Sequence, residues 1–207
     1  MVNKNIVIIG YSGHGFVLID VALENQLKIV GYADKNEKLS NPFQLKYLGS
    51  EMKSDFFSKH ESADYLIGIG DNYIRDNIYN RIIEEHGEIL TLISQSAIIS
   101  NSAIIGKGTF INKSVSINAF AKIGENVILN TACIIEHDCE VADSVHIAPG
   151  AVLAGNVTIG ERSFIGANSV IKQGVTIGKD VVVGAGTVVL KNIYDGKKIV
   201  GNPSRYI

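Results

Sequence analysis

A histidine between two carboxylates is the part of this sequence best suited to chemistry. The segment 136–138 reads EHD, with His137 at its centre. A carboxylate beside an imidazole stabilises the imidazolium that forms when the ring accepts a proton, which suits a general base working near neutral pH. We therefore expect His137 to accept a proton during a reaction, supported by Asp138 or by Glu136. The alternative is an ordinary surface histidine.

A glycine-rich segment near the start of the chain could bind phosphate. Residues 10–15 read GYSGHG, and they follow an apolar stretch. Glycines let a main chain approach a phosphate, and a helix that starts there offers unpaired N–H groups. Asp34 follows about twenty residues later, where a carboxylate can accept a ribose hydroxyl. The pattern predicts a nucleotide site, the alternative being a tight strand-to-helix turn. His14 either contacts the ligand or caps the helix.

The elements around this turn predict a parallel α/β sheet of Rossmann-like type over residues 1–94. Apolar stretches at 5–10, 28–33, 64–70 and 88–93 alternate with helical patterns at 16–26 and from about 72 to 86, and residues 35–63 look irregular with one short element. About four strands leave no room for a second mononucleotide-binding half. A nucleoside-diphosphate sugar therefore fits this domain better than NAD.

Residues 95–207 carry a repeat with a period of six. From Ile99 to Val189, each of sixteen positions spaced six apart holds Ile, Leu or Val, and the position two before it holds Val or a small residue. This period is typical of a β-solenoid in which three hexapeptides close a triangular coil of eighteen residues. Both positions point inward, and we expect slightly more than five coils. Cys133 and Cys139 fall on the small inward positions, which indicates core packing rather than a disulfide, a metal site or a nucleophile.

The register of the repeat brings further residues to the histidines. His137 falls at a corner, and His146 directly precedes a core position, so it points outward. Gly155 follows His137 by one coil and should stack about 5 Å above it. A glycine there leaves room for a thioester carbonyl, and its N–H could stabilise an oxyanion. The alternative is a glycine that only permits a tight corner.

Composition excludes several classes of protein. The net charge is −2 and hydrophobic residues make up 46% of the chain, so disorder is not expected and no basic nucleic-acid surface is predicted. The first apolar run is too short for a membrane span or a signal sequence, which predicts a cytoplasmic protein. A zinc hydratase built on the solenoid would need three histidine ligands, and the repeats hold two, so no metal is expected.

The order of these motifs resembles the NeuD/PglD family of sugar acetyltransferases along essentially the whole chain. The shared features are GxSGHG, a strand ending in Asp, IGIGDNxxR, the run NTxxxIEHxCxxxxxxHIxPGAxLAGNVxIG and a C-terminal VGNPSR. The resemblance implies a left-handed parallel β-helix, a homotrimer with active sites between subunits, and acetyl-CoA as co-substrate. It implies His137 as catalytic base tuned by Asp138. It also implies acetyl-CoA contacts at His146, Gly155, Ala167 and Ala185, and contacts to a UDP-sugar at Ser12, Gly13, His14, Asp34, Lys35 and Gly70.

These observations together predict an acetyl-CoA-dependent N-acetyltransferase. The expected acceptor is a nucleotide-linked amino sugar of the UDP-4-amino-4,6-dideoxy-N-acetylhexosamine type, whose amine attacks the thioester directly. One alternative is O-acetylation of a sialic acid or another sugar hydroxyl. An alternative of another class is a trimer that binds a nucleotide sugar without catalysis.

Overall fold

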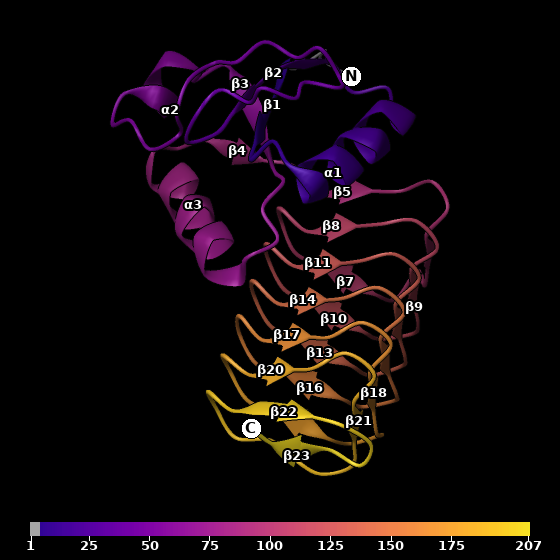
Figure 1. The fold of residues 1–207 in the computed structure, drawn as a ribbon. Coiled ribbons are helices and arrows are strands. Elements are labelled where there is room, and N and C mark those ends of the chain that lie inside the picture. The colour runs from indigo at the N-terminus through magenta and orange to yellow at the C-terminus, as the bar shows by residue number, and fades with distance from the viewer. Residues whose placement is uncertain (1–4) are drawn as a thin grey trace. The chain divides into compact units, whose positions relative to one another are not determined.

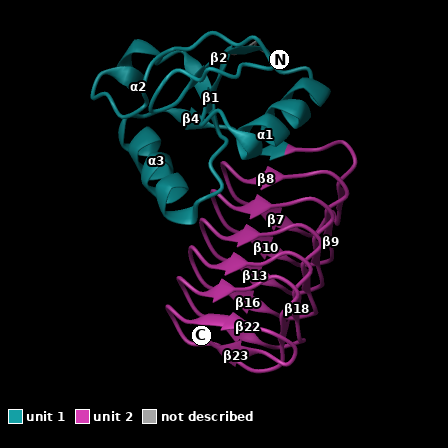
Figure 2. Cartoon of the chain, in the orientation of Figure 1, with its two compact units in different colours: residues 1–92 teal, residues 93–207 magenta. Residues whose placement is uncertain are grey.

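Residues 5–207 are described by the computed structural model, and they belong to two units. Unit 1 covers residues 1–92 and unit 2 covers residues 93–207 (Figure 2). The division falls two residues before the boundary expected between residues 94 and 95. Within residues 5–207, no helix is long and apolar enough to cross a membrane.

Unit 1 is a parallel four-stranded sheet with helices in its connections. Its strands are β1 (Asn5–Ile9), β2 (Ile29–Ala33), β3 (Ala63–Ile67) and β4 (Glu88–Ile89), in the order β2-β1-β3-β4. Its helices are α1 (Gly13–Glu24), α2 (Phe56–Lys59) and α3 (Asn72–Glu84). The chain leaves β1 toward one edge and β3 toward the other, so α1 and α3 cover opposite faces of the sheet (Figure 1). The order reverses between β1 and β3, where ligands bind in folds of this class.

Two predicted elements of unit 1 have different limits in the structure. Helix α1 begins at Gly13, three residues earlier than expected, because Ser12 is extended and the glycine turn leads directly into the helix. The strand expected at 88–93 is broken. Its first part is β4, whereas residues 92–93 form β5, which pairs within the solenoid.

Unit 2 is a left-handed parallel β-helix with three sheets, one on each side of a triangular coil (Figure 1). The first sheet contains β5 (Leu92–Ile93), β8 (Phe110–Ile111), β11 (Ile128–Leu129), β14 (His146–Ile147), β17 (Phe164–Ile165), β20 (Val182–Val183), β22 (Lys198–Val200) and β23 (Arg205–Tyr206). The second contains β6 (Ile98–Ile99), β9 (Ser116–Ile117), β12 (Ile134–Ile135), β15 (Val152–Leu153), β18 (Val170–Ile171) and β21 (Val188–Val189). The third contains β7 (Ile104–Ile105), β10 (Lys122–Ile123), β13 (Glu140–Val141), β16 (Thr158–Ile159) and β19 (Thr176–Ile177).

The predicted aliphatic positions form the core of the solenoid. From Ile111 to Val189 each of them is at most 3% exposed. Ile99 and Ile105 are only partly buried, because β6 and β7 are the outermost strands of their sheets and no earlier coil covers them. The small inward residues pack in the same core, including both cysteines.

The solenoid extends further than the sequence pattern indicates. The period of six ends at Val189, but β22 continues the first sheet by pairing with β20, and β23 then pairs antiparallel to β22. In this last turn Ile199 pairs with Val183, sixteen residues away instead of eighteen. A repeat shortened by two residues breaks the sequence period while keeping the strand in register, so the estimate of slightly more than five coils was too low.

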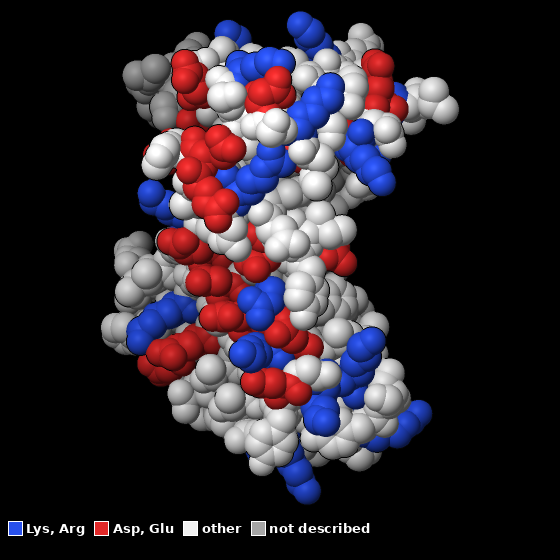
Figure 3. All heavy atoms as spheres, turned by 90° about the vertical axis from the view of Figure 1, so that its left-hand side faces the viewer, with Lys and Arg blue, Asp and Glu red and all other residues white. Residues whose placement is uncertain are grey.

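Charged side chains of both signs share the surface. On the face shown in Figure 3, Lys and Arg side chains are interspersed with Asp and Glu, and no extended basic area is present there. Some of these charges pair between coils, as in the ion pair of Arg162 with Asp180 at 2.8 Å and that of Lys122 with Glu140 at 2.8 Å. The exposed Lys122–Glu140 pair adds little stability, whereas the Arg162–Asp180 pair is mostly buried and has a second contact from Nη2 to Oδ2 at 3.0 Å.

Truncating one core aliphatic should measure how much the solenoid depends on its core. Ile165→Ala removes a fully buried side chain, so we expect the free energy of unfolding to fall by about 2–5 kcal/mol. Ile104→Ala is the matched control, because that side chain is 63% exposed, and it should change stability by about 0.5 kcal/mol or less. Denaturant titration measures both. Equal losses would contradict the assignment of the inward positions.

Candidate functional site

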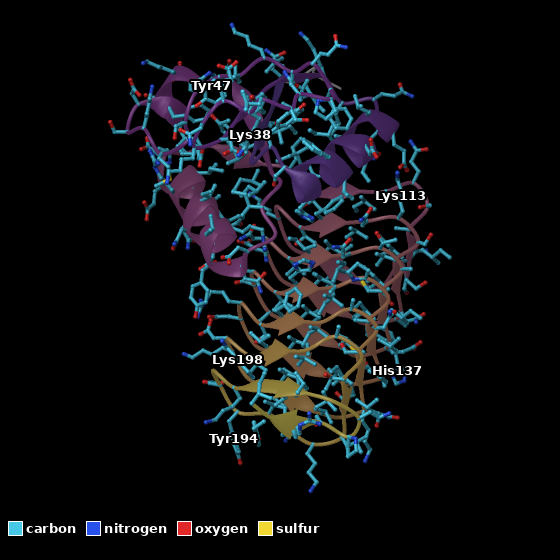
Figure 4. The ribbon with its side chains drawn as sticks, in the orientation of Figure 1. Lys38, Tyr47, Lys113, His137, Tyr194 and Lys198 are labelled. Atoms are coloured by element: carbon cyan, nitrogen blue, oxygen red, sulfur yellow. The ribbon has the colours of Figure 1, made fainter. Side chains whose placement is uncertain are left out.

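His137 and Asp138 form one corner of the solenoid, between the second and third sheets. Asp138 has a φ of +58°, the left-handed conformation that turns the chain from β12 into β13. The coils on both sides fix this corner. The Asp138 N–H donates to the carbonyl of Ala119 at 3.0 Å, and the His137 carbonyl accepts from the N–H of Asn156 at 2.8 Å. The side chains of His137 and Asp138 are 52% and 57% exposed, and His137 lies at the edge of the solenoid (Figure 4).

The imidazole is held by Asp138. Its Nδ1 lies 2.9 Å from the Asp138 Oδ2. A carboxylate oxygen accepts a hydrogen bond from an N–H, so this contact favours the ring form with the proton on Nδ1, in which Nε2 is the nitrogen with the lone pair. The main-chain N–H of Glu136 donates to the carbonyl of Leu153 at 3.0 Å, as part of the pairing of β12 with the next coil. Since Asp138 occupies Nδ1, Nε2 is the ring nitrogen of His137 that is left for proton exchange with a substrate.

Gly155 provides the space in which the imidazole lies. A Cβ built on Gly155 would be 2.5 Å from the His137 Nε2 and 2.6 Å from Cε1. The expected stacking of Gly155 on His137 is therefore present, but the space we expected to be left for a thioester carbonyl is filled by the imidazole itself. The lack of a side chain at Gly155 lets the ring lean over the next coil.

The two cysteines pack inside the coils near this corner. The Cys139 thiol donates to the carbonyl of Ala154 at 3.2 Å, directly before Gly155. Burial raises the pKa of Cys139, and it raises the pKa of Cys133 to about 12. Both side chains are thiols at neutral pH and unsuited to nucleophilic attack.

The other residues expected to bind acetyl-CoA lie at a different corner. Ala167 and Ala185 stack eighteen residues apart between the first and second sheets, where the Gly186 N–H donates to the carbonyl of Ala167 at 2.8 Å. Gly155 belongs to the His137 corner instead. One protomer therefore presents these predicted contacts at two separate edges of its triangular coil.

His146 lies on the outer face of the first sheet, as expected, but it is only 8% exposed. Its Nε2 is 3.3 Å from the Asn130 Nδ2, and its ring packs edge-on against Phe164 with the centroids 5.1 Å apart. Asn130 directly precedes the turn that contains Thr131, which stacks in the same corner as Ala167. Asn130 and Phe164 were not singled out from the sequence, although their spacing of sixteen and eighteen residues from His146 would have indicated them.

Unit 1 contains a cavity of about 600 Å³ at the carboxyl ends of its strands. Four of the six residues predicted to bind the nucleotide sugar line it, namely Ser12, Asp34, Lys35 and Gly70. Gly13 and His14 are not among its lining residues, and they occupy the first turn of α1 beside Ser12. The cavity lies where the strand order reverses, because its walls come from the segments that follow β1, β2 and β3.

Asp34 holds the glycine turn in place. Its Oδ2 accepts the Tyr11 N–H at 2.9 Å, and its Oδ1 forms an ion pair with Lys38 at 2.8 Å. Lys38 and Glu51 also line the cavity. The sequence did not indicate them, because they lie in the irregular segment 35–63, where no periodicity relates a residue to its neighbours in space.

The glycines of the turn have different roles. Gly10 has a φ of +90°, and a Cβ there would lie 2.5 Å from the Ile69 Cγ1. A Cβ on Gly15 would collide with the carbonyl oxygen of Gly10. Gly13 has open space where its Cβ would be. Packing therefore requires glycine at positions 10 and 15, whereas it permits a side chain at position 13.

A buried arginine organises the loop after β3. Arg75 is 1% exposed, and its guanidinium donates to the carbonyls of Ile69 and Gly70, each at 3.3 Å, and to the Asn72 Oδ1 at 3.0 Å. Burial, and to a smaller extent the positive charge of Arg75, lower the pKa of His14 to about 4. His14 is therefore neutral at pH 7.

Within residues 5–207, no group of three or more His, Cys, Asp or Glu side chains could hold a metal ion.

Comparison with known protein families matches three segments of the chain. Residues 5–82 match the PglD N-terminal domain. Residues 120–155 match the bacterial transferase hexapeptide (six repeats), and residues 156–191 match the hexapeptide repeat of succinyl-transferase. The three matches cover both units.

Curated and solved proteins resemble the chain closely. UDP-N-acetylbacillosamine N-acetyltransferase of Bacillus subtilis is 32% identical over 108 residues, which span 51% of this chain and about half, 50%, of that relative. The acetyltransferase domain of PglB from Neisseria gonorrhoeae, solved with acetyl coenzyme A, is 31% identical with a TM-score of 0.91 and covers 99% of this chain and 100% of its own. A single-site mutant of perosamine N-acetyltransferase from Caulobacter crescentus, solved with CoA and GDP-perosamine, is 29% identical with a TM-score of 0.92. This match covers 99% of this chain and 97% of that one.

The lowered pKa of His14 predicts a specific pH dependence of stability. In the folded chain His14 stays neutral down to about pH 4, whereas in the unfolded chain it protonates near its usual value of 6.5. The unfolded state therefore binds more protons as the pH falls from 6.5 to about 4, and the contribution of neutral His14 to stability is lost across that window.

We expect His14→Gln to lose less stability than the wild type between pH 6.5 and 4, while the difference between the two proteins stays constant above pH 6.5. Urea titrations followed by tyrosine fluorescence measure this, since six of the eight tyrosines lie in unit 1. Parallel curves for the two proteins across the whole range would contradict the buried, neutral state of His14.

Proposed function

Since the chain belongs to the PglD-type family of hexapeptide-repeat sugar acetyltransferases, we propose that it transfers the acetyl group of acetyl-CoA to the amine of a nucleotide-linked amino sugar. The proposed acceptor is of the UDP-4-amino-4,6-dideoxy-N-acetylhexosamine type. The curated relative is named for a UDP-linked amino sugar, one solved relative is a perosamine N-acetyltransferase, and the other is an acetyltransferase domain solved with acetyl coenzyme A. The observation that carries the proposal is the half-exposed His137–Asp138 pair, in which Asp138 contacts Nδ1 and Nε2 lies over Gly155 of the next coil.

The proposed reaction is direct transfer. An amine of this kind is largely protonated near pH 7, and it must lose a proton before its nitrogen lone pair can form a bond to the thioester carbon. That ammonium proton is released to solvent. As the neutral nitrogen bonds to the thioester carbon it becomes positively charged, so His137 Nε2 accepts one of its remaining protons and Asp138 stabilises the imidazolium that results. The carbon–sulfur bond then breaks, coenzyme A leaves as a thiolate, and the imidazolium can return the proton to the sulfur. The products are the N-acetylated sugar and free coenzyme A.

Gly155 has two parts in this proposal. Its missing side chain gives the imidazole its position, which the 2.5 Å distance to a hypothetical Cβ supports. Its N–H is the proposed donor to the oxyanion of the tetrahedral intermediate. The remaining acetyl-CoA contacts are assigned to His146, Ala167 and Ala185.

The nucleotide sugar is assigned to unit 1. The cavity of about 600 Å³ has a size suited to a small ligand, and glycine-turn residues and a helix N-terminus adjoin it. Ser12, Asp34, Lys35 and Gly70 are the proposed contacts in the cavity wall, with Gly13 and His14 contributing from the first turn of α1. The open space at Gly13 is compatible with close approach of a diphosphate.

We assign the active form to a homotrimer. One protomer carries the His137 corner and the Ala167–Ala185 corner at different edges of its coil, so a site using both draws them from neighbouring protomers. The outer face of the second sheet, which lies between these two corners, carries an apolar row that suits a subunit contact. The row consists of Ile98, Ile134, Val152, Val170 and Val188, interrupted by Ser116 after its first member, and Ile98 is 72% and Val170 40% exposed.

A panel of acceptors tests the reaction. The release of coenzyme A thiol from acetyl-CoA is measured with UDP-, GDP- and dTDP-linked 4-amino sugars and with sialic acids. Transfer to an amino sugar with no comparable transfer to a sialic acid supports the proposal. Preferred O-acetylation of a sialic acid, or no thiol release with any acceptor, would contradict it.

Substitutions at the His137 corner separate the roles of its residues. His137→Ala should lower turnover by about 10²–10⁴ while acetyl-CoA still binds, because the base is lost and the coenzyme contacts remain. Asp138→Asn should also lower turnover, by about tenfold or more, because an amide no longer stabilises the imidazolium.

Glu136→Gln is the matched control, because the same charge is removed from the other neighbour of His137, and it should stay near the wild-type rate. Steady-state kinetics with both substrates and calorimetry of acetyl-CoA binding measure these effects. A full rate in His137→Ala, or a larger loss in Glu136→Gln than in Asp138→Asn, would refute the assignment.

A further inference from the structure

One corner of the solenoid holds a side chain that the fold does not favour there. Phe120 has a φ of +61°. The other residues of unit 2 with positive φ are Gly, Asn, Asp, Ser, Ala or Arg, and Phe120 is the aromatic exception among the described corners. A bulky side chain is disfavoured in the left-handed conformation. Folding alone would be better served by a small or polar residue at this position.

Burial of the ring does not compensate for this unfavourable conformation. Phe120 is 64% exposed, whereas the core residues of the same coil, such as Ile117 and Ile123, are almost fully buried. The Phe120 N–H donates to the Ser102 Oγ at 3.1 Å, so the main chain of the corner is held without help from the ring. Backbone strain that brings no stability to the fold is often found at functional sites.

Phe120 lies one coil before the candidate catalytic pair, in the same corner. Position 120 stacks beneath Asp138, and position 119 stacks beneath His137, as the 3.0 Å hydrogen bond from the Asp138 N–H to the Ala119 carbonyl shows. On the opposite side of the pair, the imidazole itself lies over Gly155. The surface on the N-terminal side of His137 therefore consists of the small Ala119 side chain and the exposed phenyl ring.

We propose that Phe120 is a specificity residue whose ring contacts the sugar of the acceptor while its amine approaches His137. This inference rests on the proposed function. At the His137 corner itself the proposed coenzyme contact is Gly155, one coil after the histidine, so the sugar is left with the side that faces earlier coils. A 4,6-dideoxy sugar carries a methyl group and apolar C–H groups, and an aromatic ring offers these a large apolar surface with little loss of conformational freedom.

Binding measurements isolate the contribution of the ring. The variant is Phe120→Asn, because asparagine already occupies the left-handed corners at Asn156 and Asn168 and should fold there at least as well. Phe120→Tyr keeps the aromatic face. Ile104→Asn is the matched control, an equally exposed apolar residue (63%) in a strand of the third sheet instead of at a left-handed corner position. Calorimetry with the intact protein gives Kd values for UDP, for the UDP-4-amino sugar and for acetyl-CoA.

We expect the wild type to bind the UDP-4-amino sugar more tightly than UDP. Phe120→Asn should weaken binding of the UDP-4-amino sugar about tenfold, while its affinities for UDP and for acetyl-CoA change less than twofold. Phe120→Tyr and Ile104→Asn should match the wild type, and the melting temperature of Phe120→Asn should equal or exceed that of the wild type. The proposal is overturned if Phe120→Asn binds the UDP-4-amino sugar with the wild-type Kd. It is also overturned if the variant loses acetyl-CoA binding or dissociates as an oligomer instead of losing sugar binding.

Acetyl transfer by the wild type is measured in parallel. If the wild type transfers acetyl but Phe120→Asn binds the sugar normally, the inference fails and the proposed function stands. If the wild type shows no transfer yet Phe120→Asn selectively weakens sugar binding, the proposed function fails and the role of Phe120 in binding stands.

Discussion

Parallel pairing of each strand with the strand eighteen residues away is the constraint on which the functional part of this protein depends. It pairs His146 with Ile128 and Phe164, and Ile147 with Leu129 and Ile165, and the same shift is kept through the regular coils. Because the main chain sets this register, residues eighteen apart meet whatever their side chains are. The corner of His137 is thereby placed between Ala119 and Gly155, which decides where the imidazole can lie.

The same register explains what the sequence could predict. Inward positions, the corner location of His137 and its stacking on Gly155 all follow from counting in sixes and eighteens, and the structure has them. Counting does not give the direction of a side chain, so it could not show that the imidazole itself fills the space over Gly155. It also missed the last coil, where Ile199 pairs with Val183 after a shortened repeat.

Unit 1 was less predictable because its cavity depends on an irregular segment. The turn 10–15 and Asp34 could be found, since each adjoins a strand whose pattern is clear. Lys38 and Glu51 come from residues 35–63, where neither the helical nor the strand period applies. The role of Arg75 could not be predicted for another reason. Its place in a helical pattern gives its spacing from the other residues of the helix, but it does not show that the guanidinium donates to the carbonyls of the preceding loop.

The central claim is that the His137 corner of one protomer and the Ala167–Ala185 corner of another act on the same pair of substrates. The most direct measurement is a crystal structure with coenzyme A and the UDP-4-amino sugar bound. The account predicts the sugar amine within hydrogen-bonding distance of the His137 Nε2, about 3 Å, and the coenzyme in contact with both corners, contributed by two protomers. An amine far from Nε2, or a coenzyme held along the corners of a single protomer, would contradict it.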